Sequence, residues 1–311
     1  MMRIVAIGGG HGLSATVAAA RLLDAHVTAV VSMADDGGSS GRLRDEFAVL
    51  PPGDLRMALL ALADPAHSTL AQLFGHRFSG DGALGGHSMG NLALTALWQQ
   101  GRDVVGSLRE LGLLLNIAGE VLPVATVPHA LCATIEYSDG SVHEVIGQAR
   151  IAASAGRIAD VRTLPDTVVA CPEALVAIER ADLVLLGPGS WFTSVLAPLC
   201  VSGVVEAIAQ SAANVVLVAN RQSTSGEAAG FGVRDYLDSL MTAHPSLRID
   251  AVIAANAAAD SAGSGGDVPA GSVRVVDYGD QNLTASHEPE ILARSLREAA
   301  YSLREGQRGA V

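Results

Sequence analysis

Short continuous runs of apolar residues alternate with amphipathic segments along most of the chain. Arg3–Ile7 and Val27–Val31 are such runs, and Leu13–Leu23 between them has the apolar spacing and alanine content of a helix. Continuous apolar runs of this length are typical of strands that are buried on both faces of a parallel sheet. The pattern therefore predicts a βαβ unit with a right-handed crossover at the start of the chain.

The same alternation of strands and helices returns after the first unit and again in the second half of the chain. Asp54 follows the break Pro51-Pro52-Gly53 and is predicted to cap the helix that it begins. This order predicts a Rossmann-like, doubly wound and mostly parallel α/β sheet. The predicted helices are Asp54–Ala63, Leu70–Arg77, Asn91–Gln99, Ser107–Asn116, Pro172–Arg180, Gly203–Gln210, Val233–His244 and Pro289–Arg304, and the later strands are Leu183–Leu186, Val215–Val218, Ala251–Ala255 and Val273–Asp277.

The middle of the chain has a different pattern. Val121–Val127, Ala130–Glu136, Val142–Ile151 and Arg157–Leu164 resemble short strands, and the second and third are joined by a Ser-Asp-Gly turn. We predict a small β-rich insertion or lobe at residues 120–165, within a single α/β domain that spans residues 1–311. Asp260–Gly271 is rich in glycine, serine and alanine and is predicted to be a flexible segment.

Composition narrows the partners and the chemistry. The net charge of −12 argues against nucleic acid or an anionic membrane as the main partner. All twenty basic residues are arginine, which excludes a phosphate-binding lysine, a Schiff-base lysine and a lysine general base. Cys132, Cys171 and Cys200 have no metal-like spacing. No apolar run is long enough to span a membrane and Met1–Arg3 leads straight into a strand, so we expect a soluble cytoplasmic protein.

A glycine-rich loop, Gly8-Gly9-Gly10-His11-Gly12, follows the first predicted strand. It matches the dinucleotide fingerprint G-x-G-x-x-G only loosely, because Leu13 stands where a small residue is needed. Glycine suits a backbone that approaches a phosphate closely, and a helix N-terminus favours anions. We predict that Gly9, Gly10 and Gly12 contact phosphate, with His11 at the edge of the site. A plain tight turn is the alternative interpretation.

The most informative stretch is Ala34-Asp35-Asp36-Gly37-Gly38-Ser39-Ser40-Gly41-Arg42, directly after the second predicted strand. Its carboxylates can hold a divalent cation such as Mg²⁺ or orient a hydroxyl, and its glycines and serines offer N–H and hydroxyl groups to phosphate. Asp35 and Asp36 point oppositely on an extended chain, so one is predicted to face the ligand while the other braces the loop. An exposed Asp-Gly turn is the alternative. The predicted ligand residues here are Asp35, Asp36, Gly38, Ser39, Ser40, Arg42 and Arg44, with Mg²⁺ on Asp35 or Asp36.

Two further loops have the same character. Gly85–Asn91 precedes an apolar helix and could place His87 and Ser88 on an anion, with Asn91 binding a carbonyl or amide group; an ordinary helix start is the alternative. Gly187-Pro188-Gly189-Ser190 follows an apolar strand and precedes a predicted helix, so it predicts a second nest of N–H groups. Asn220, just past the strand Val215–Val218, occupies the equivalent edge position and is predicted to bind the ligand. Thr193 is also predicted as a ligand residue, with helix capping as the alternative, and Trp191 can equally be a core residue.

In this order the loops resemble the gluconeogenesis-factor (YvcK) branch of the CofD-like proteins. The matching segments are Ile7–Leu13, Ala34–Arg44, Pro51–Arg56, Gly86–Asn91 and Leu186–Ser194. The resemblance implies a Rossmann-like cytoplasmic protein that binds UDP-sugars, notably UDP-N-acetylglucosamine. Such proteins support cell shape and envelope synthesis during gluconeogenic growth, and family members often form homodimers, so a homodimer and a partner from cell-envelope synthesis are expected.

The resemblance also leaves a second function open. CofD itself is a magnesium-dependent transferase that moves a phospholactyl group onto a deazaflavin, and its aspartate after the second strand would fall on Asp35 or Asp36. The run Gly-Gly-Ser-Ser-Gly-Arg has the YvcK form, which favours binding and regulation over transfer. An NAD-binding oxidoreductase is a third and weaker hypothesis, because no constellation for hydride transfer is evident.

The C-terminal part departs from the family pattern. The family often carries a tyrosine in a helical segment there and an Arg-His-Asp-like sequence that helps to hold the UDP-sugar. Here Asp260–Gly271 contains no tyrosine, and Ser286 stands where the arginine would be. We therefore expect the affinity for the family's ligand to be weakened or changed.

Overall fold

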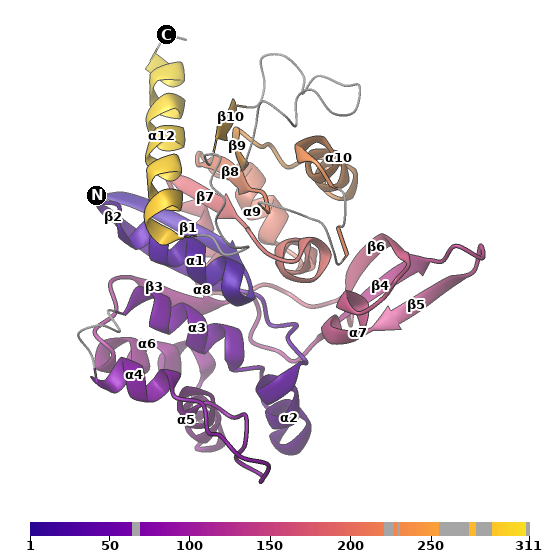
Figure 1. Cartoon of the computed structure of the whole chain (residues 1–311). Coiled ribbons are helices and arrows are strands. Elements are labelled where there is room, and N and C mark those ends of the chain that lie inside the picture. Colours follow the sequence, from indigo (N-terminus) through magenta and orange to yellow (C-terminus); the bar gives the residue numbers. More distant parts are fainter. Residues whose placement is uncertain (64–68, 221–226, 229–230, 255–273, 278–287, 309–311) are drawn as a thin grey trace.

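The computed structural model describes residues 1–63, 69–220, 227–228, 231–254, 274–277 and 288–308. Its centre is a seven-stranded sheet in which every neighbouring pair of strands is parallel. The strand order is β10-β9-β8-β7-β1-β2-β3 (Figure 1). The strands are β1 Met2–Gly8, β2 Ala25–Val31, β3 Glu120–Pro123, β7 Leu183–Leu186, β8 Asn214–Val218, β9 Ala251–Ala254 and β10 Arg274–Asp277.

Helices join these strands and cover both faces of the sheet, which confirms the Rossmann-like α/β fold. The connection from β1 to β2 and the connection from β7 to β8 run in opposite directions across the sheet. Right-handed crossovers therefore place α1 and α9 on opposite faces. The helices are α1 Gly10–Arg21, α2 Gly38–Phe47, α3 Gly53–Leu62, α4 Thr69–Gly75, α5 Met89–Gln99, α6 Val104–Leu114, α7 Gln148–Ala152, α8 Pro172–Glu179, α9 Val204–Gln210, α10 Val233–Ala243 and α12 Pro289–Arg308.

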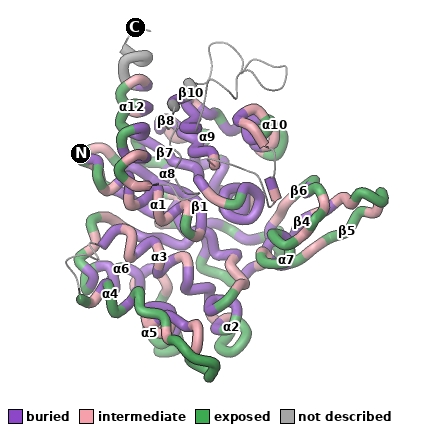
Figure 2. Tube along the Cα trace, in the orientation of Figure 1, coloured by how far each residue is buried: buried purple, intermediate pink, exposed green. Residues whose placement is uncertain are grey.

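The core lies on both sides of the central strands. Ile4–Ile7 of β1 and Leu183–Leu186 of β7 are buried at every position, as the unbroken apolar runs predict (Figure 2). Because both faces of these two strands are packed, polar side chains can reach solvent only at the strand ends. The polar groups of these two strands are therefore expected in the loops at their ends.

The strand order reverses between β1 and β7, because the chain leaves β1 toward β2 and leaves β7 toward β8. In doubly wound sheets the crevice outside the carboxyl ends of the strands at such a switch point is where ligands bind. The loops after β1, β2 and β7 lie along this edge, as do residues 219–220 directly after β8. These are the loops that the sequence singles out.

A second sheet, with the strand order β5-β4-β6, projects from the body of the protein as an arm (Figure 1). It is antiparallel and consists of β4 Ala130–Glu136, β5 Val142–Ile146 and β6 Arg157–Leu164. The boundaries differ from the predicted insertion at residues 120–165, because β3 pairs with β2 in the main sheet. The strand predicted at Val142–Ile151 is also too long: Gly147 has a φ of +105°, and the chain turns there into α7.

Three local predictions need correction. Asp54 does not cap its helix, because α3 already begins at Gly53. The polar stretch after β2 is a loop only as far as Gly37, and α2 begins at Gly38. The helix after β7 begins as a π-helical turn, Trp191–Leu196, followed by a 3₁₀ turn, Ala197–Cys200.

Two predictions cannot be compared with the structure. The flexible segment Asp260–Gly271 and Ser286 lie outside the described residues. Among the helices that are described, none is both long enough and apolar enough to cross a membrane.

Candidate functional site

The loops after β1 and β7 touch through their backbones at the switch point. A Cβ atom placed on Gly12 would lie 2.0 Å from the carbonyl oxygen of Pro188, so only glycine allows this approach. Nearby, the Thr16 hydroxyl donates a hydrogen bond of 2.8 Å to the carbonyl oxygen of Gly187. The two glycine-rich loops predicted to bind phosphate are thus brought together into one continuous floor.

The glycines at the tip of the first loop face a carboxylate. Gly10 has a φ of +60°, and its backbone N–H donates a hydrogen bond to Asp54. A Cβ atom on Gly9 would lie 2.8 Å from Asp54 Oδ2. The N–H group predicted to meet a phosphate therefore already serves a carboxylate from the first turn of α3.

Burial raises the pKa of Asp54 to about 7, and the negative charge of Asp35 acts in the same direction. The Gly10 N–H bond and the positive charge of Arg56 oppose this shift. Asp54 is a site residue that the sequence reasoning interpreted as a helix cap. Its position in the matching segment Pro51–Arg56 was the signal that could have identified it.

Asp35 and Asp36 point in different directions. Asp35 Oδ1 accepts a hydrogen bond of 3.0 Å from the Gly37 N–H, and Oδ2 would lie 3.2 Å from a Cβ on Gly53, toward α3. Asp36 Oδ1 accepts a hydrogen bond of 2.8 Å from the Ala149 N–H in the first turn of α7. Asp35 therefore points toward the start of α3, where Asp54 lies, and Asp36 holds the first turn of α7 at the base of the arm.

Asp35 and Asp54 lie close enough at this edge for the charge of Asp35 to raise the pKa of Asp54. Carboxylate oxygens suit Mg²⁺, which usually keeps several water ligands and needs only one or two carboxylates from the protein. In the part of the chain that the structure describes, no group of three or more His, Cys, Asp or Glu side chains is arranged around a metal position. The donor set fits a hydrated Mg²⁺ ion better than a metal enclosed by protein ligands.

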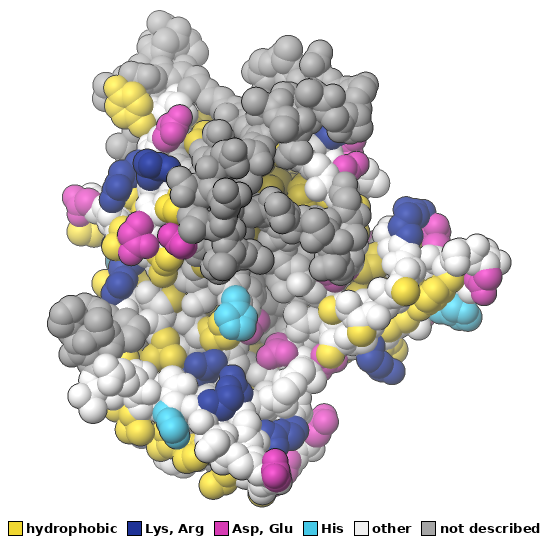
Figure 3. Space-filling model, viewed as in Figure 1, with side chains coloured by type: hydrophobic (Ala, Val, Ile, Leu, Met, Phe, Trp, Pro, Cys, Tyr) yellow, Lys and Arg dark blue, Asp and Glu magenta, His cyan; other side chains and the backbone are white. Residues whose placement is uncertain are grey.

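The arginines of the second loop hold neighbouring loops in place. Arg44 donates to the carbonyl oxygens of Asp35 at 3.1 Å and His129 at 3.0 Å. Arg42 is exposed and donates to the carbonyl oxygen of Gly85 at 2.6 Å. Figure 3 shows basic side chains gathered over α2 and α5, with acidic side chains and a histidine beside them. The arginines thus organise the loops and also supply positive charge near the predicted phosphate positions.

A buried polar network joins α2, α3 and α5. The Asn91 amide nitrogen donates to Ser39 Oγ at 2.9 Å, and Arg56 Nε donates to Asn91 Oδ1 at 3.0 Å. Ser39 Oγ lies 2.8 Å from His87 Nδ1. Ser39 Oγ has two lone pairs besides its proton, so after accepting from Asn91 it can pair with Nδ1 in either tautomer of the neutral imidazole ring. Burial, followed by the nearby charge of Arg42, lowers the pKa of His87 and favours this neutral form.

The remaining predicted residues of this half occupy several environments. Ser88 is fully buried and caps α5 by accepting a hydrogen bond of 3.3 Å from the Asn91 N–H. Ser40 Oγ accepts a hydrogen bond of 3.0 Å from the Gly53 N–H, which ties α2 to α3. His11 and Gly38 are exposed, at the N-terminal turns of α1 and α2. The solvent-exposed part of this half is therefore at the starts of α1 and α2, and Ser40 and Ser88 are buried beneath it.

The loop after β7 is fixed by a side chain from the strand next to it. Asn220, which follows β8, donates to the Gly189 carbonyl oxygen at 2.7 Å and accepts from the Gly189 N–H at 3.2 Å. Gly187 and Gly189 have φ values of +77° and +155°, and Ser190 is exposed beside them. Asn220 thus acts on the loop backbone itself.

The π-helical turn after this loop is closed by a carboxylate that the sequence reasoning missed. Glu227 Oε1 accepts hydrogen bonds from the N–H groups of Phe192 at 2.9 Å and Thr193 at 3.1 Å, and from the Thr193 hydroxyl at 3.2 Å. Burial raises the pKa of Glu227. Thr193 is itself buried and supports this turn, and no local sequence pattern marks Glu227 as its partner. Trp191 is a core residue that packs edge-to-face on Tyr236.

The fold and this edge define a class: a Rossmann-like α/β protein with glycine-rich loops and carboxylates at the switch point of its sheet. Residues 4–276 match the protein family described as 2-phospho-L-lactate transferase CofD. The chain belongs to the CofD family.

Within this family, the chain is similar to proteins named gluconeogenesis factors. A protein of Mycobacterium tuberculosis H37Rv, provisionally named a gluconeogenesis factor, is 48% identical over 255 residues, which is 80% of this chain and 75% of the relative. The gluconeogenesis factor of Halalkalibacterium halodurans is 39% identical over 238 residues, covering 76% of this chain and 72% of the relative.

Solved structures agree with the fold. A Bacillus halodurans protein of the UPF0052 family superposes with a TM-score of 0.75 at 37% identity, covering 82% of this chain and 81% of that one. A second crystal structure from Bacillus halodurans gives a TM-score of 0.80 at 31% identity and covers 95% and 99% of the two chains.

Proposed function

We propose that this protein is a regulatory protein that binds a nucleotide sugar of the UDP-N-acetylglucosamine type and acts without turnover. In this proposal it works in the cytoplasm as a homodimer and supports cell shape and envelope synthesis during gluconeogenic growth, through a protein partner in envelope synthesis. The gluconeogenesis-factor names of its relatives support the physiological setting.

The observation that carries the proposal is the contact between Gly12 and Pro188. It joins two glycine-rich loops, each at the carboxyl end of a central strand, at the switch point of the sheet. The start of α1 at this contact favours an anion, and the open space at Gly10 leaves room for a diphosphate. In this proposal Asp35, on the next loop, accepts hydrogen bonds from sugar or ribose hydroxyls.

A magnesium-dependent phosphotransferase of the CofD type is the second candidate. The pairing of Asp35 with Asp54 favours it, because two adjacent carboxylates can share a divalent cation that neutralises phosphate charge. In either case a phosphate entering beside Asp54 meets a like charge unless that carboxyl group is protonated or shares a cation. Dependence of ligand binding on Mg²⁺ is therefore informative for both candidates.

Calorimetric titration of the purified protein tests the proposal. The ligands are UDP-N-acetylglucosamine, UDP-glucose, GDP and NAD, each with and without Mg²⁺. Saturable binding of a UDP-sugar that is recovered unchanged supports the sensor. Preference for GDP with a strict requirement for Mg²⁺ favours the transferase, and binding of NAD alone contradicts both.

Gly10 and Gly101 supply a matched pair of variants that tests the proposed position of the diphosphate. Gly10→Asp places a negative charge at the proposed phosphate position, and a Cβ there meets no atom within 4 Å. Gly101→Asp makes the same change at another glycine with a positive φ, +78°, and open space around it. We expect Gly10→Asp to abolish UDP-sugar binding and Gly101→Asp to retain it. Equal binding by both variants would refute this placement of the diphosphate.

A further inference from the structure

A groove opens at the opposite edge of the sheet, between α6 and α8. Its volume is about 490 Å³, and its floor is the amino-terminal part of β1 and β2 with the start of β3. The strand register places Val5, Thr28 and Glu120 in one row across these strands. A second hollow of about 460 Å³ continues the groove along α6 and shares His26, Arg109 and Glu120 with it. Each is large enough for a metabolite-sized molecule.

One wall of the groove is a single face of α8. The lining residues Glu173, Val176, Ala177 and Arg180 are spaced three and four apart, which aligns them along one side of the helix. Val176 is 43% exposed, and Ala177 is half-buried. This wall therefore offers an apolar strip between a carboxylate, Glu173, and a cation, Arg180.

Three arginines line the groove, and two of them are already paired. Arg3 lies 3.5 Å from Asp182, and Arg109 lies 3.1 Å from Glu120. Among the described residues, the Arg180 side chain has no hydrogen-bond or ion-pair partner. Arg180 is thus the cation that an incoming molecule meets without displacing a protein carboxylate.

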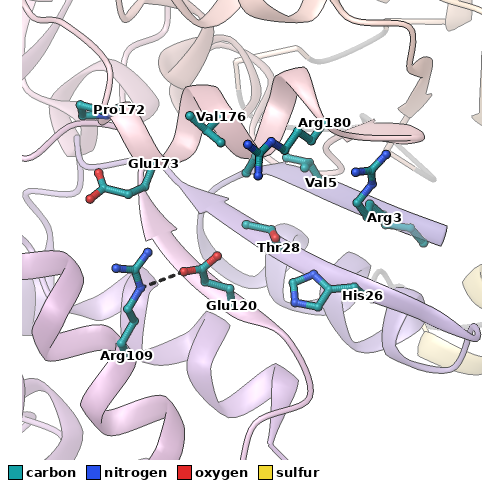
Figure 4. A pocket seen from close by; sticks show the side chains of 12 residues that line it. Arg3, Val5, His26, Thr28, Arg109, Glu120, Pro172, Glu173, Val176 and Arg180 are labelled. Carbon is teal, nitrogen blue, oxygen red and sulfur yellow. Dashed lines mark hydrogen bonds and ion pairs between the residues drawn. The ribbon is translucent and has the colours of Figure 1, made fainter. Parts of the chain in front are cut away.

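The directions of the side chains favour one kind of ligand. Figure 4 shows Arg180 reaching from α8 over β1 beside Val5, whereas Arg109 reaches from α6 to Glu120. A guanidinium group beside apolar side chains such as Val5 and Val176 suits an oxyanion, because its planar fork can donate two parallel hydrogen bonds. The chain as a whole carries a net charge of −12, so this is a local feature and not part of a generally basic surface.

We propose that the groove binds a small organic anion, whose carboxylate or phosphate group pairs with Arg180 and whose apolar body lies against Val5, Val176 and Ala177. This site is separate from the proposed nucleotide-sugar site. The groove lies along the first half of β1, from Arg3 to Val5, whereas the glycine-rich loop follows Gly8 at the other end of the strand, about 10 Å from Val5.

Titration calorimetry with benzoate, phenyl phosphate and neutral benzamide tests the proposal. We expect saturable binding of at least one of the anions and none of benzamide, and the preferred anion distinguishes a carboxylate from a phosphate ligand. Arg180→Gln should weaken anion binding about tenfold, since it removes a charge-assisted hydrogen bond. Val176→Asp, at an exposed position, should weaken it as well by adding a like charge to the wall.

Arg294→Gln is the matched control, because Arg294 is an exposed arginine on α12. Its anion affinity should equal that of the unchanged protein. The Gly10→Asp protein should also keep this affinity even if it loses UDP-sugars, which separates this site from the proposed function. Equal affinity of Arg180→Gln and the unchanged protein, loss of the affinity in Gly10→Asp, or no saturable binding of either anion at millimolar concentration would each overturn the proposal.

Discussion

The two edges of one parallel sheet organise their polar groups differently. At the carboxyl edge, Ser39, His87, Asn91 and Arg56 are buried and joined by successive hydrogen bonds. At the amino edge, Arg109 and Glu120 form an ion pair whose side chains are 53% and 30% exposed. A buried network holds its groups in one arrangement and is costly to break, whereas exposed ion pairs contribute little and can rearrange. The carboxyl edge is thus preorganised, and the amino edge is adaptable.

The largest effect is expected where the two carboxyl-edge loops touch. Gly12→Ala must push the chain away from the Pro188 carbonyl oxygen, so we expect a loss of about 3 kcal/mol in the free energy of unfolding. Gly10→Ala is the control: its Cβ meets no atom, and its φ of +60° costs about 1 kcal/mol. Urea unfolding measures both, and similar losses in the two variants would show that the loops can separate freely.

The second-largest loss of stability is expected in the buried network of Ser39, His87, Asn91 and Arg56. Asn91→Ala removes the donor to Ser39 and the acceptor of Arg56, and leaves both groups buried without these bonds. We expect a loss of about 2 kcal/mol in the free energy of unfolding. Thr95→Ala, one turn further along α5, removes a single local hydrogen bond and should cost about 1 kcal/mol. If Asn91→Ala costs no more than this control, the network does not act as a unit.

Asp54 should make the stability of the carboxyl edge depend on pH. Its pKa in the folded protein is about 7, above the ordinary value of 3.8, so the folded state holds this proton more tightly than the unfolded state. The resulting stability is fully present below pH 3.8 and is lost as pH rises through about 7. We expect it to amount to roughly 2 kcal/mol, because part of the residue remains in contact with solvent.

Asp54→Asn isolates this contribution. The difference in unfolding free energy between the unchanged protein and the variant should favour the unchanged protein more strongly at pH 5 than at pH 8. A difference that stays constant over this range would show that Asp54 does not titrate there.

The smallest effect is expected at the amino edge. Arg109→Ala breaks the ion pair with Glu120, and because both side chains are partly exposed we expect a change of only about 0.5 kcal/mol. Thermal unfolding at low and high salt measures it, and salt should reduce the effect further. A loss as large as that of Asn91→Ala would erase the distinction between the two edges.

The fold and the position of the site follow from local patterns, because each depends on residues close together in sequence. The apolar runs at Arg3–Ile7 and Val27–Val31 are strands, and their loops reach the carboxyl edge because parallel strands end on the same side. The start of α2 at Gly38 was missed, since two glycines and two serines resemble a loop when tertiary packing is ignored.

What could not be predicted depends on contacts between distant segments. Asp54 looks like a helix cap until α3 packs against α1 and brings it to the Gly10 N–H. Glu227 meets the N–H groups of Phe192 and Thr193 only because the chain returns to the same edge after β8. The membership of β3 in the main sheet was also missed, because a four-residue strand between two kinds of sheet has no signal of its own.

The Asp36–Ala149 hydrogen bond couples the base of the arm to the occupancy of the candidate site. One carboxylate oxygen of the loop after β2 accepts the hydrogen bond of an amide in the first turn of α7, so a ligand or cation that draws Asp36 inward must release that amide. The Ala149 N–H would then exchange its hydrogen faster, and the base of the arm would loosen. The exchange rate of this one amide would then report whether a ligand occupies the carboxyl edge of the sheet.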